Sequence, residues 1–323
     1  MEAAQGTIVV TGSSGLIGSA VIQRLGAPPA GTERFDIVGF DREGPPHPPP
    51  LAECVCVDLT SDDSLRDGLE RVRHGYGTRI ASVIHLAAYY DFSGEPSPLY
   101  DVLTVQGTDR LLRQLRAFEV EQFVFSSTML VHAPCEPGQR INEDWPLEPK
   151  WAYPESKVTT ERLVREQRGD VPAVVLRIAG VYDDACHSIP LAHQMQRIYE
   201  RRLTAGLFPG DVTRGQAFLH LDDLVDSIAN AVGRRRELPA ASVVLLGEED
   251  TLSYDTLQRT FSSLIHGEEL ETRQIPKALA KAGAWVLDNA PLGEEPFIKP
   301  WMIDLADDHY ALDTGRARTL LGW

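Results

Sequence analysis

The chain has 323 residues, of which 47 are acidic and 31 basic, for a formal net charge of −16 at pH 7. This charge opposes general adhesion to nucleic acid or to an anionic membrane surface, so we expect neither as a partner. No apolar run reaches the ~18 residues that span a bilayer, and no basic segment with an apolar signal core opens the sequence, which favours a cytoplasmic protein.

The first 180 residues alternate short apolar, β-branched runs with helical patterns. Continuous hydrophobic strands separated by amphipathic helices are typical of a parallel sheet that is covered on both faces. We therefore predict the α/β class and a doubly wound, Rossmann-type parallel sheet. Residues 44–50 hold five prolines and predict a surface loop. The expected strands are 7–11, 35–41, 54–58, 81–86, 122–126 and 173–178.

Beyond residue 178 the regular alternation fades. Glycine, proline and charged residues interrupt short helical patterns at 193–202, 221–232 and 276–287, and a short apolar strand from Ser242 to Leu246 could return to the main sheet. We expect two domains, a nucleotide-binding domain at 1–178 and a smaller carboxyl-terminal substrate-binding lobe at 179–323.

The cysteines and histidines predict no metal site. Cys54, Cys56, Cys135 and Cys186 show neither zinc-site spacing nor a CxxC pair, and the histidines show no ligand spacing. We expect free buried thiols, because Cys54 and Cys56 would share one face of a strand, which is typical of neighbouring core positions.

A glycine-rich turn follows the first expected strand. Gly12 permits a tight turn, Gly15 lets the backbone approach a pyrophosphate, and Gly18 lets the following helix pack near the strand. Free amides and the positive end of a helix then bind an anion. The sequence thus predicts a dinucleotide-binding loop whose contacts are made by Gly12, Ser14, Gly15, Leu16, Ile17 and Gly18.

Two acidic positions follow the second and third strands. Asp41 lies 23 residues after Gly18, where a carboxylate accepts hydrogen bonds from the adenosine ribose and repels a 2′-phosphate. NAD is therefore the expected cofactor, although Arg42 leaves NADP open. Asp58 and Leu59 are placed to contact adenine, and Asp58 could equally cap a helix.

Tyr153 and Lys157 are four residues apart and would share one face of a helix. A free phenol has a pKa of about 10, and the lysine ammonium would lower it towards the range of a useful base. Alone, the pattern is also that of an exposed aromatic ring beside a solvated charge.

Together these residues resemble the extended short-chain dehydrogenase/reductase superfamily, in its NAD-dependent epimerase/dehydratase group. The resemblance implies that Tyr153 is the general acid/base, that Lys157 binds the nicotinamide ribose, and that Thr128 orients the substrate oxygen. It also implies cofactor contacts from Leu86, Ala87, Ala88 and Ser126. The matching segments are 11–18, Asp41, 58–59, 85–88, 125–128, 153–157, 176–177, 218–223 and 320–323.

The departures from the family bear on the substrate. Dehydratases of the family follow the hydroxyl residue with an acidic pair, but Met129 and Leu130 stand here, so we do not expect dehydration. Sugar-nucleotide epimerases usually hold the diphosphate with an asparagine and arginines. Gly180 and Gln216 occupy two of those positions, and the segment 301–308 carries three aspartates that would repel a diphosphate, while Arg214 could replace one clamp.

An aromatic segment, Tyr89-Tyr90-Asp91-Phe92, follows the fourth strand at the edge of the sheet where ligands bind. It resembles the hydroxysteroid-dehydrogenase-like and carbonyl-reductase-like branches and favours a less charged substrate, contacted by Tyr90, Thr128 and Met129. The same aromatics could instead pack the core between the domains.

Three functions follow from this sequence. The first is an NAD(P)-dependent oxidoreductase that transfers hydride to or from a secondary alcohol or ketone, and the second is a sugar-nucleotide epimerase. The third is a non-catalytic NAD(P) sensor, against which the intact Tyr153 and Lys157 pair argues. Relatives pair through the tyrosine helix and the helix at 100–118, so a homodimer acting on a small-molecule substrate is expected.

Overall fold

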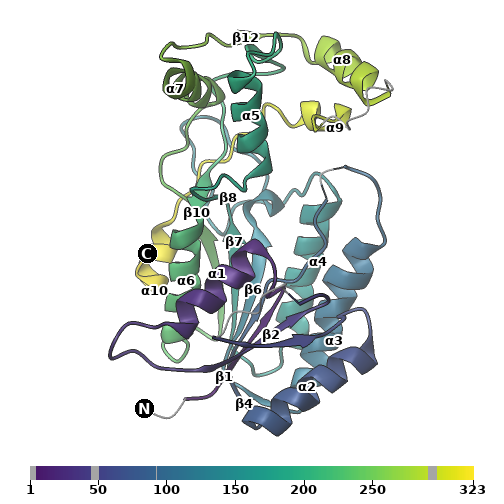
Figure 1. The fold of residues 1–323 in the computed structure, drawn as a ribbon, viewed down its shortest axis with the longest axis vertical. Helices are drawn as coiled ribbons and strands as arrows, with labels where there is room; N and C mark the ends of the chain where they lie inside the picture. Colours follow the sequence, from purple (N-terminus) through teal and green to yellow (C-terminus); the bar gives the residue numbers. More distant parts are fainter. Residues whose placement is uncertain (1–4, 45–50, 92, 290–296) are drawn as a thin grey trace.

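The computed structural model describes residues 5–44, 51–91, 93–289 and 297–323 (Figure 1). Most of the predicted loop at 44–50, and Phe92 of the aromatic segment, lie outside these ranges. The main sheet has eight strands in the order β11-β7-β6-β4-β1-β2-β3, with β5 paired to β4, and every pairing is parallel. The doubly wound α/β fold is confirmed. Its strands are β1 (Thr7–Thr11), β2 (Asp36–Asp41), β3 (Glu53–Cys56), β4 (Arg79–His85), β5 (Glu119–Val120), β6 (Phe123–Thr128), β7 (Ala173–Ile178) and β11 (Ala241–Leu246).

Helices cover both faces of the sheet (Figure 1). Ile8 and Val10 of β1 pack on the side of α1 and α6, while Val9 between them packs on the side of α2 and α3. Successive side chains of a strand point to opposite faces, so an apolar run without alternation fits a strand that is buried on both. One layer holds α1 (Leu16–Gly26), α6 (Leu221–Gly233) and α10 (Gly315–Leu321); the other holds α2 (Asp62–Tyr76), the π-helical turn η1 (Tyr100–Val105), α3 (Gln106–Leu115) and α4 (Ala152–Gln167).

A smaller lobe lies beyond the carboxyl ends of the strands (Figure 1). It contains two short two-stranded sheets, β8 with β10 and β9 with β12. The chain leaves the main sheet after β7 and comes back as β11, which pairs with β7 from Ala241 opposite Ala173 to Leu246 opposite Ile178. The remaining elements are β8 (Gly180–Tyr182), α5 (Ile189–Tyr199), β9 (Leu207–Phe208), β10 (Phe218–His220), α7 (Tyr254–His266), β12 (Arg273–Gln274), α8 (Lys277–Asn289) and α9 (Pro300–Asp304).

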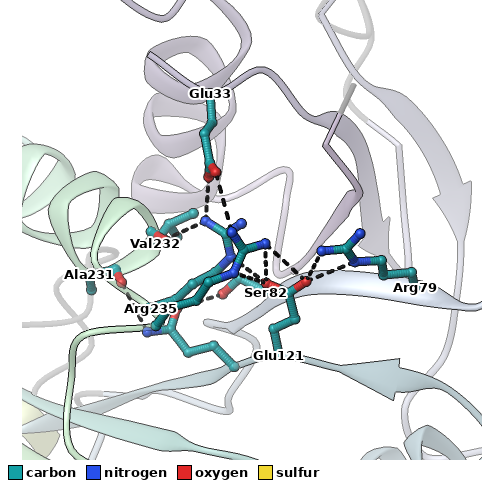
Figure 2. A network of polar contacts seen from close by, with 9 residues as sticks. Glu33, Arg79, Ser82, Glu121, Ala231, Val232 and Arg235 are labelled. Carbon is teal, nitrogen blue, oxygen red and sulfur yellow. Dashed lines mark hydrogen bonds and ion pairs between the residues drawn. The ribbon is translucent and has the colours of Figure 1, made fainter. Parts of the chain in front are cut away.

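A buried ionic network joins segments at the amino-terminal edge of the sheet (Figure 2). Arg235 follows α6, is 2% exposed, and contacts Glu33 at 2.5 Å and Glu121 at 2.8 Å. Arg79 also contacts Glu121, at 2.7 Å. The network therefore holds α6 against β4, β5 and the segment before β2, at the edge opposite the lobe. Among the described helices, none is both long and apolar enough to cross a membrane.

Candidate active site

The glycine-rich turn between β1 and α1 is tightly packed on two sides and open on the third. Gly12 has a φ of +71°, and a Cβ there would lie 2.9 Å from the amide nitrogen of Ala87. A Cβ on Gly18 would lie 2.2 Å from the carbonyl oxygen of Gly12. At Gly15 only that same oxygen, at 3.4 Å, approaches the Cβ position, and no described side chain caps α1. The turn therefore fits the close approach of a pyrophosphate to free helix amides.

Asp41 ends β2 beside this turn. Its Oδ2 accepts a hydrogen bond from the amide of Ser14 at 2.9 Å, and its Oδ1 accepts one from the amide of Arg42 at 2.8 Å. A carboxylate oxygen has two lone pairs, so both oxygens keep the capacity to accept from a ribose hydroxyl. The Arg42 side chain is exposed, with Glu43 3.9 Å away. This arrangement suits NAD better than NADP, because the carboxylate charge would repel a 2′-phosphate.

Asp58 stabilises a turn and does not cap a helix. Its Oδ1 accepts bonds from the amide of Thr60 at 2.8 Å and from the hydroxyl of Thr60 at 2.7 Å, and these bonds hold the pKa of Asp58 below its usual value. The side chain of Ser61 caps α2 instead. Leu59 is 5% exposed and packs in the core beneath α2 and α3, so its placement is that of a packing residue.

A buried polar chain fixes the segment 86–88 against the glycine-rich turn. The amide of Ala87 donates to the Thr11 hydroxyl at 3.2 Å, and that hydroxyl lies 2.7 Å from Nδ1 of His85. Nε2 of His85 lies 2.8 Å from the Thr108 hydroxyl. Burial and the nearby charge of Lys157 lower the pKa of His85 to about 3, so the ring is neutral. The sequence suggested no role for Thr11, His85 or Thr108.

Tyr153 and Lys157 lie at the start of α4, as the sequence predicted. Lys157 is 2% exposed, and its Nζ donates to the carbonyl oxygen of Ser126 at 2.7 Å. The same Nζ lies 5.7 Å from the ring centroid of Tyr153 and 4.9 Å from that of Phe125. Burial lowers the pKa of Lys157 to about 7, while the carboxylate of Glu161 opposes that change.

The pKa of Tyr153 shifts in the direction opposite to the one expected. Burial raises this pKa above the ordinary value, and Lys157 does not reverse the effect. The reason is that Lys157 is itself desolvated and engaged by a backbone carbonyl, so loss of water around the phenol dominates. Tyr153 is therefore a neutral phenol at pH 7, which is the form that donates a proton.

Thr128 ends β6, two residues beyond the predicted end of that strand. Ser126, Ser127 and Thr128 continue the pairing with β7, which explains the extension. The Thr128 hydroxyl accepts from the amide of Leu130 at 3.3 Å and keeps its own hydrogen for donation. Met129 begins the short 3₁₀ turn η2 (Met129–Val131), is 2% exposed and packs in the core, and its contact with substrate stays a prediction.

Four aromatic rings form a continuous row that includes Tyr153. Tyr90 meets Tyr153 edge-on with centroids 4.5 Å apart, Trp151 lies 5.4 Å from Tyr153, and Trp301 lies 5.2 Å from Trp151. Tyr90 is 49% exposed, so it is not a core residue. Tyr89 does pack inward, against Tyr100 at 4.9 Å. Neither tryptophan was expected in the site from the sequence, although Trp151 stands only two residues before Tyr153.

Two sets of bonds hold this aromatic row in place. On one side, Nε1 of Trp301 donates to the carbonyl oxygen of Ser93 at 3.2 Å. On the other, the π-helical turn η1 holds the segment that carries Tyr90, because Thr104 accepts from the amide of Tyr89 at 3.0 Å and Tyr100 donates to the carbonyl of Asp91 at 3.2 Å. Turns of this type are frequent at functional sites.

The three aspartates of the segment 301–308 do not present free negative charge. Each forms an ion pair with a lysine, and the two charges of each pair cancel. The expectation that these aspartates repel a diphosphate is therefore corrected. The same pairs also occupy three lysines that could otherwise have held a phosphate. The pairs are Asp304 with Lys281, Asp307 with Lys277 and Asp308 with Lys150, each at 2.6 Å.

Arg214 and Gly180 lie at positions that bear on the binding of a diphosphate. Arg214 contacts Glu136 at 2.6 Å and Asp211 at 3.5 Å, and it lines a cavity of about 530 Å³ in the lobe. Gly180 lies in β8, where a Cβ would be 3.0 Å from the ring of Phe218. An asparagine side chain at that position would therefore displace the ring.

Comparison with known proteins places these features in context. The model of the NAD-dependent epimerase/dehydratase family matches residues 8–247. The chain is 26% identical over 246 residues to the uncharacterized UDP-glucose epimerase YtcB of Bacillus subtilis, covering 70% of this chain and 72% of that protein. It is 21% identical over 280 residues to the decarboxylating sterol-4-alpha-carboxylate 3-dehydrogenase ERG26 of Saccharomyces cerevisiae, covering 82% and 76%.

Among solved structures, the UDP-glucuronic acid 4-epimerase from Bacillus cereus in complex with UDP-glucuronic acid and NAD is similar in fold. The TM-score is 0.72 at 20% identity, and the match covers 98% of this chain and 93% of that one. The likeness therefore extends over the sheet and the lobe alike.

Proposed function

The chain belongs to the NAD-dependent epimerase/dehydratase family, whose members are enzymes, and from this premise we propose an NAD-dependent oxidoreductase that acts on an uncharged secondary alcohol or ketone. The observation that carries the proposal is the aromatic row of Tyr90, Tyr153, Trp151 and Trp301. Such a surface favours an apolar ring or chain over a diphosphate. The ion pairs of Lys150, Lys277 and Lys281 support this choice, because they leave those lysines committed.

The residues present fit NAD. The open glycine-rich turn would hold the pyrophosphate, Asp41 the adenosine ribose and Lys157 the nicotinamide ribose. When bound, NAD supplies the hydride acceptor or donor. We assign residues 1–178, completed by β11, to cofactor binding, and the smaller lobe to substrate binding.

Tyr153 supplies the proton in this proposal. As a neutral phenol it would donate its proton to the oxygen of a ketone that bound NADH reduces, which leaves a phenolate; in the reverse direction the phenolate would take the proton from the alcohol that NAD oxidises. Thr128 donates its free hydroxyl hydrogen to the same substrate oxygen and orients it. The ring of Tyr90 at the edge of Tyr153 helps to exclude water from this proton.

The test is net turnover of NADH. We expect the purified protein to oxidise NADH with a neutral aryl ketone such as 1-tetralone, followed by absorbance, and Tyr153→Phe to lower kcat by about 10²–10⁴ with an unchanged Kd for NADH. Tyr76→Phe is the control, since Tyr76 donates to Glu53, away from this site. Failure of every neutral ketone to consume NADH, with conversion of UDP-glucose to UDP-galactose, would reject the proposal.

A sugar-nucleotide epimerase is the second candidate. The similarity to proteins named as UDP-sugar epimerases favours it, and Arg214 is the arginine in the lobe that could contact a diphosphate. An epimerase oxidises and reduces its substrate in one cycle, so it shows no net change in NADH. If the protein is an epimerase, Arg214→Ala should raise the KM for a UDP-sugar. If it is an oxidoreductase, the same substitution should leave the turnover of a neutral ketone unchanged.

We also propose a cytoplasmic homodimer that pairs through α3 and α4. These helices lie in the same layer on one face of the sheet, where a partner could extend the layer (Figure 1). A sedimentation mass equal to one chain at micromolar concentration would contradict the dimer.

A further inference from the structure

Tyr153, Lys157 and Glu161 are spaced four residues apart on α4 and form one stripe on its inner side. Glu161 is 4% exposed. A carboxylate this deeply buried costs several kcal/mol of desolvation unless charge and hydrogen bonds compensate it. Glu161 therefore needs both a charged partner and hydrogen-bond donors close by.

Two adjacent strands supply these partners. Arg177 of β7 contacts Glu161 through Nη2 to Oε2 at 2.7 Å and through Nε to Oε1 at 3.1 Å. The hydroxyl of Ser127 on β6 donates to Oε1 at 2.5 Å. Ser127 and Arg177 are direct neighbours across the pairing of β6 with β7. The carboxylate of Glu161 thus forms hydrogen bonds to two residues that lie opposite each other on neighbouring strands. The two bonds from Arg177 fix its orientation.

The end of β6 is attached to α4 at consecutive residues. The carbonyl of Ser126 accepts from Lys157, and the hydroxyl of Ser127 donates to Glu161. Thr128 comes next and carries the hydroxyl assigned to the substrate oxygen. Thr128 is therefore fixed on its amino-terminal side to the helix that carries Tyr153.

Arg177 also fixes the chain on the other side of Thr128. Its Nη1 lies 3.0 Å from Nε2 of His132 and donates to the carbonyl of Glu143 at 2.9 Å. His132 directly follows η2, which begins after Thr128. Burial and the charge of Arg177 lower the pKa of His132 to about 4, so its ring is neutral and accepts this bond. One guanidinium thus holds the segments before and after the Thr128 hydroxyl.

We propose that Glu161 and Arg177 are a positioning pair, which sets the placement of the Thr128 hydroxyl relative to the Tyr153 phenol. Neither residue touches substrate; both act through Ser127, Lys157 and the segment at His132. The proposal rests on the proposed proton transfer by Tyr153, and it applies equally to net redox and to epimerisation, because both need the same proton.

A buried ion pair need not add to the stability of the fold. Replacing a buried ion pair by apolar residues of similar volume is often neutral or stabilising, whereas directional bonds hold groups in one arrangement. Reacting groups must lie within about 0.5 Å of their productive placement, and a misplacement of about 1 Å lowers rates about 100-fold. A pair that leaves stability unchanged can therefore still control the rate.

The experiment compares two variants with one control. The double variant Glu161→Leu/Arg177→Met removes the pair without leaving an unpaired charge, and Ser127→Ala removes one bond. The control is Ser82→Ala, which removes a similar buried bond, from Ser82 to Gln122 at 3.1 Å, in the same sheet. Melting temperature, the Kd for NADH, KM and kcat are measured for each, with whichever reaction the wild type catalyses.

We expect kcat to fall about 100-fold in the double variant and about tenfold in Ser127→Ala, with KM and the Kd for NADH within about twofold of wild type. Ser82→Ala should keep its kcat. An unchanged kcat in a folded double variant would overturn the proposal; if that variant does not fold, an unchanged kcat in Ser127→Ala does so.

A crystal structure of Ser127→Ala with NAD gives a readout that needs no substrate. We expect the distance from Thr128 Oγ1 to Tyr153 Oη to change by about 0.5 Å or more from wild type, and not to change in Ser82→Ala. An unchanged distance rejects the positioning role even if no reaction has been found. Failure of the proposed function alone would leave this change in place.

Discussion

Lys157 donates a hydrogen bond from Nζ to the carbonyl oxygen of Ser126 at 2.7 Å, in surroundings that leave the lysine 2% exposed. This bond cannot replace the water that an ammonium loses on burial, and the pKa of Lys157 falls to about 7. The proposed cofactor contact is therefore made by a lysine that titrates near neutral pH.

The first prediction concerns stability against pH. Between pH 7 and about 10, an unfolded chain keeps the proton on Lys157 that the folded chain has lost, so the folded state gains stability as pH rises, by up to about 1.4 kcal/mol per pH unit. Lys157→Met lacks this gain. Urea unfolding at pH 7 to 9 should show wild type rising relative to Lys157→Met, and parallel curves would contradict the lowered pKa.

The second prediction concerns the choice of cofactor. Asp41→Ala removes the carboxylate that repels a 2′-phosphate and that binds the amide of Ser14. We expect NADH to bind more weakly and the ratio of NADPH to NADH affinity to rise at least about tenfold, since one lost charge-assisted bond costs more than 1 kcal/mol. Fluorescence titration measures both. Asp36→Ala, at the opposite end of β2, should leave the ratio unchanged; an equal shift in both variants would count against Asp41 as the selective residue.

The third prediction concerns the seat of Trp301. Gly94 has a φ of +76°, and a Cβ there would lie 2.1 Å from Nε1 of Trp301. Gly94→Ala should displace the indole, change tryptophan fluorescence and raise the KM for a ring-bearing ketone. Gly138→Ala is a matched control, because Gly138 has a φ of +90° with nothing within 4 Å of its Cβ position. Both variants pay a backbone cost of about 1 kcal/mol, so equal fluorescence and KM would show that the contact with Trp301 is unimportant.

The fourth prediction concerns the network at the far edge of the sheet (Figure 2). Arg235→Met removes the buried partner of Glu33 and Glu121, which keep only Arg79 and the exposed Arg236, so the free energy of unfolding should fall by about 2–3 kcal/mol. Arg236 contacts the same two carboxylates but its side chain is 53% exposed, so Arg236→Met should cost about 1 kcal/mol or less. Urea unfolding gives both values, and turnover of the folded protein should be unchanged. Similar losses in the two variants would show that burial does not set the cost.

Local patterns were sufficient for most of the fold. Apolar runs without alternation identified the six strands, and five of them are buried on both faces. The exception is β3 at the edge of the sheet, where Cys54 is half-buried and Cys56 exposed, so the expectation of core positions for these two cysteines was wrong. The ends were less certain: β6 runs on to Thr128 because Ile178 on the neighbouring strand offers a pairing partner. This pairing depends on the tertiary structure, so the sequence of the segment alone does not show it.

The site divides in the same way. The glycine turn, Asp41, Tyr153 and Lys157 are placed by contiguous segments and by strand ends, so their positions were predictable. The pKa of Tyr153 was not, because it depends on how much water the surrounding rings remove. Trp301 reaches the site only through the path of the lobe, which no spacing in the sequence encodes.

The lobe is built from two successive excursions of the chain away from the sheet. The first leaves after β7 and returns through α6 to β11, and the second leaves after β11 and returns to α10, in the layer of α1 and α6. Strands β7 and β11 pair along their whole length. A fragment that stopped at residue 178 would expose the edge of β7. It would also lack the helix α6, which covers the face of the sheet that carries Ile8 and Val10 of β1. The cofactor half of this enzyme therefore cannot be separated by a single cut, and any closing motion of the lobe must bend several chain segments at once.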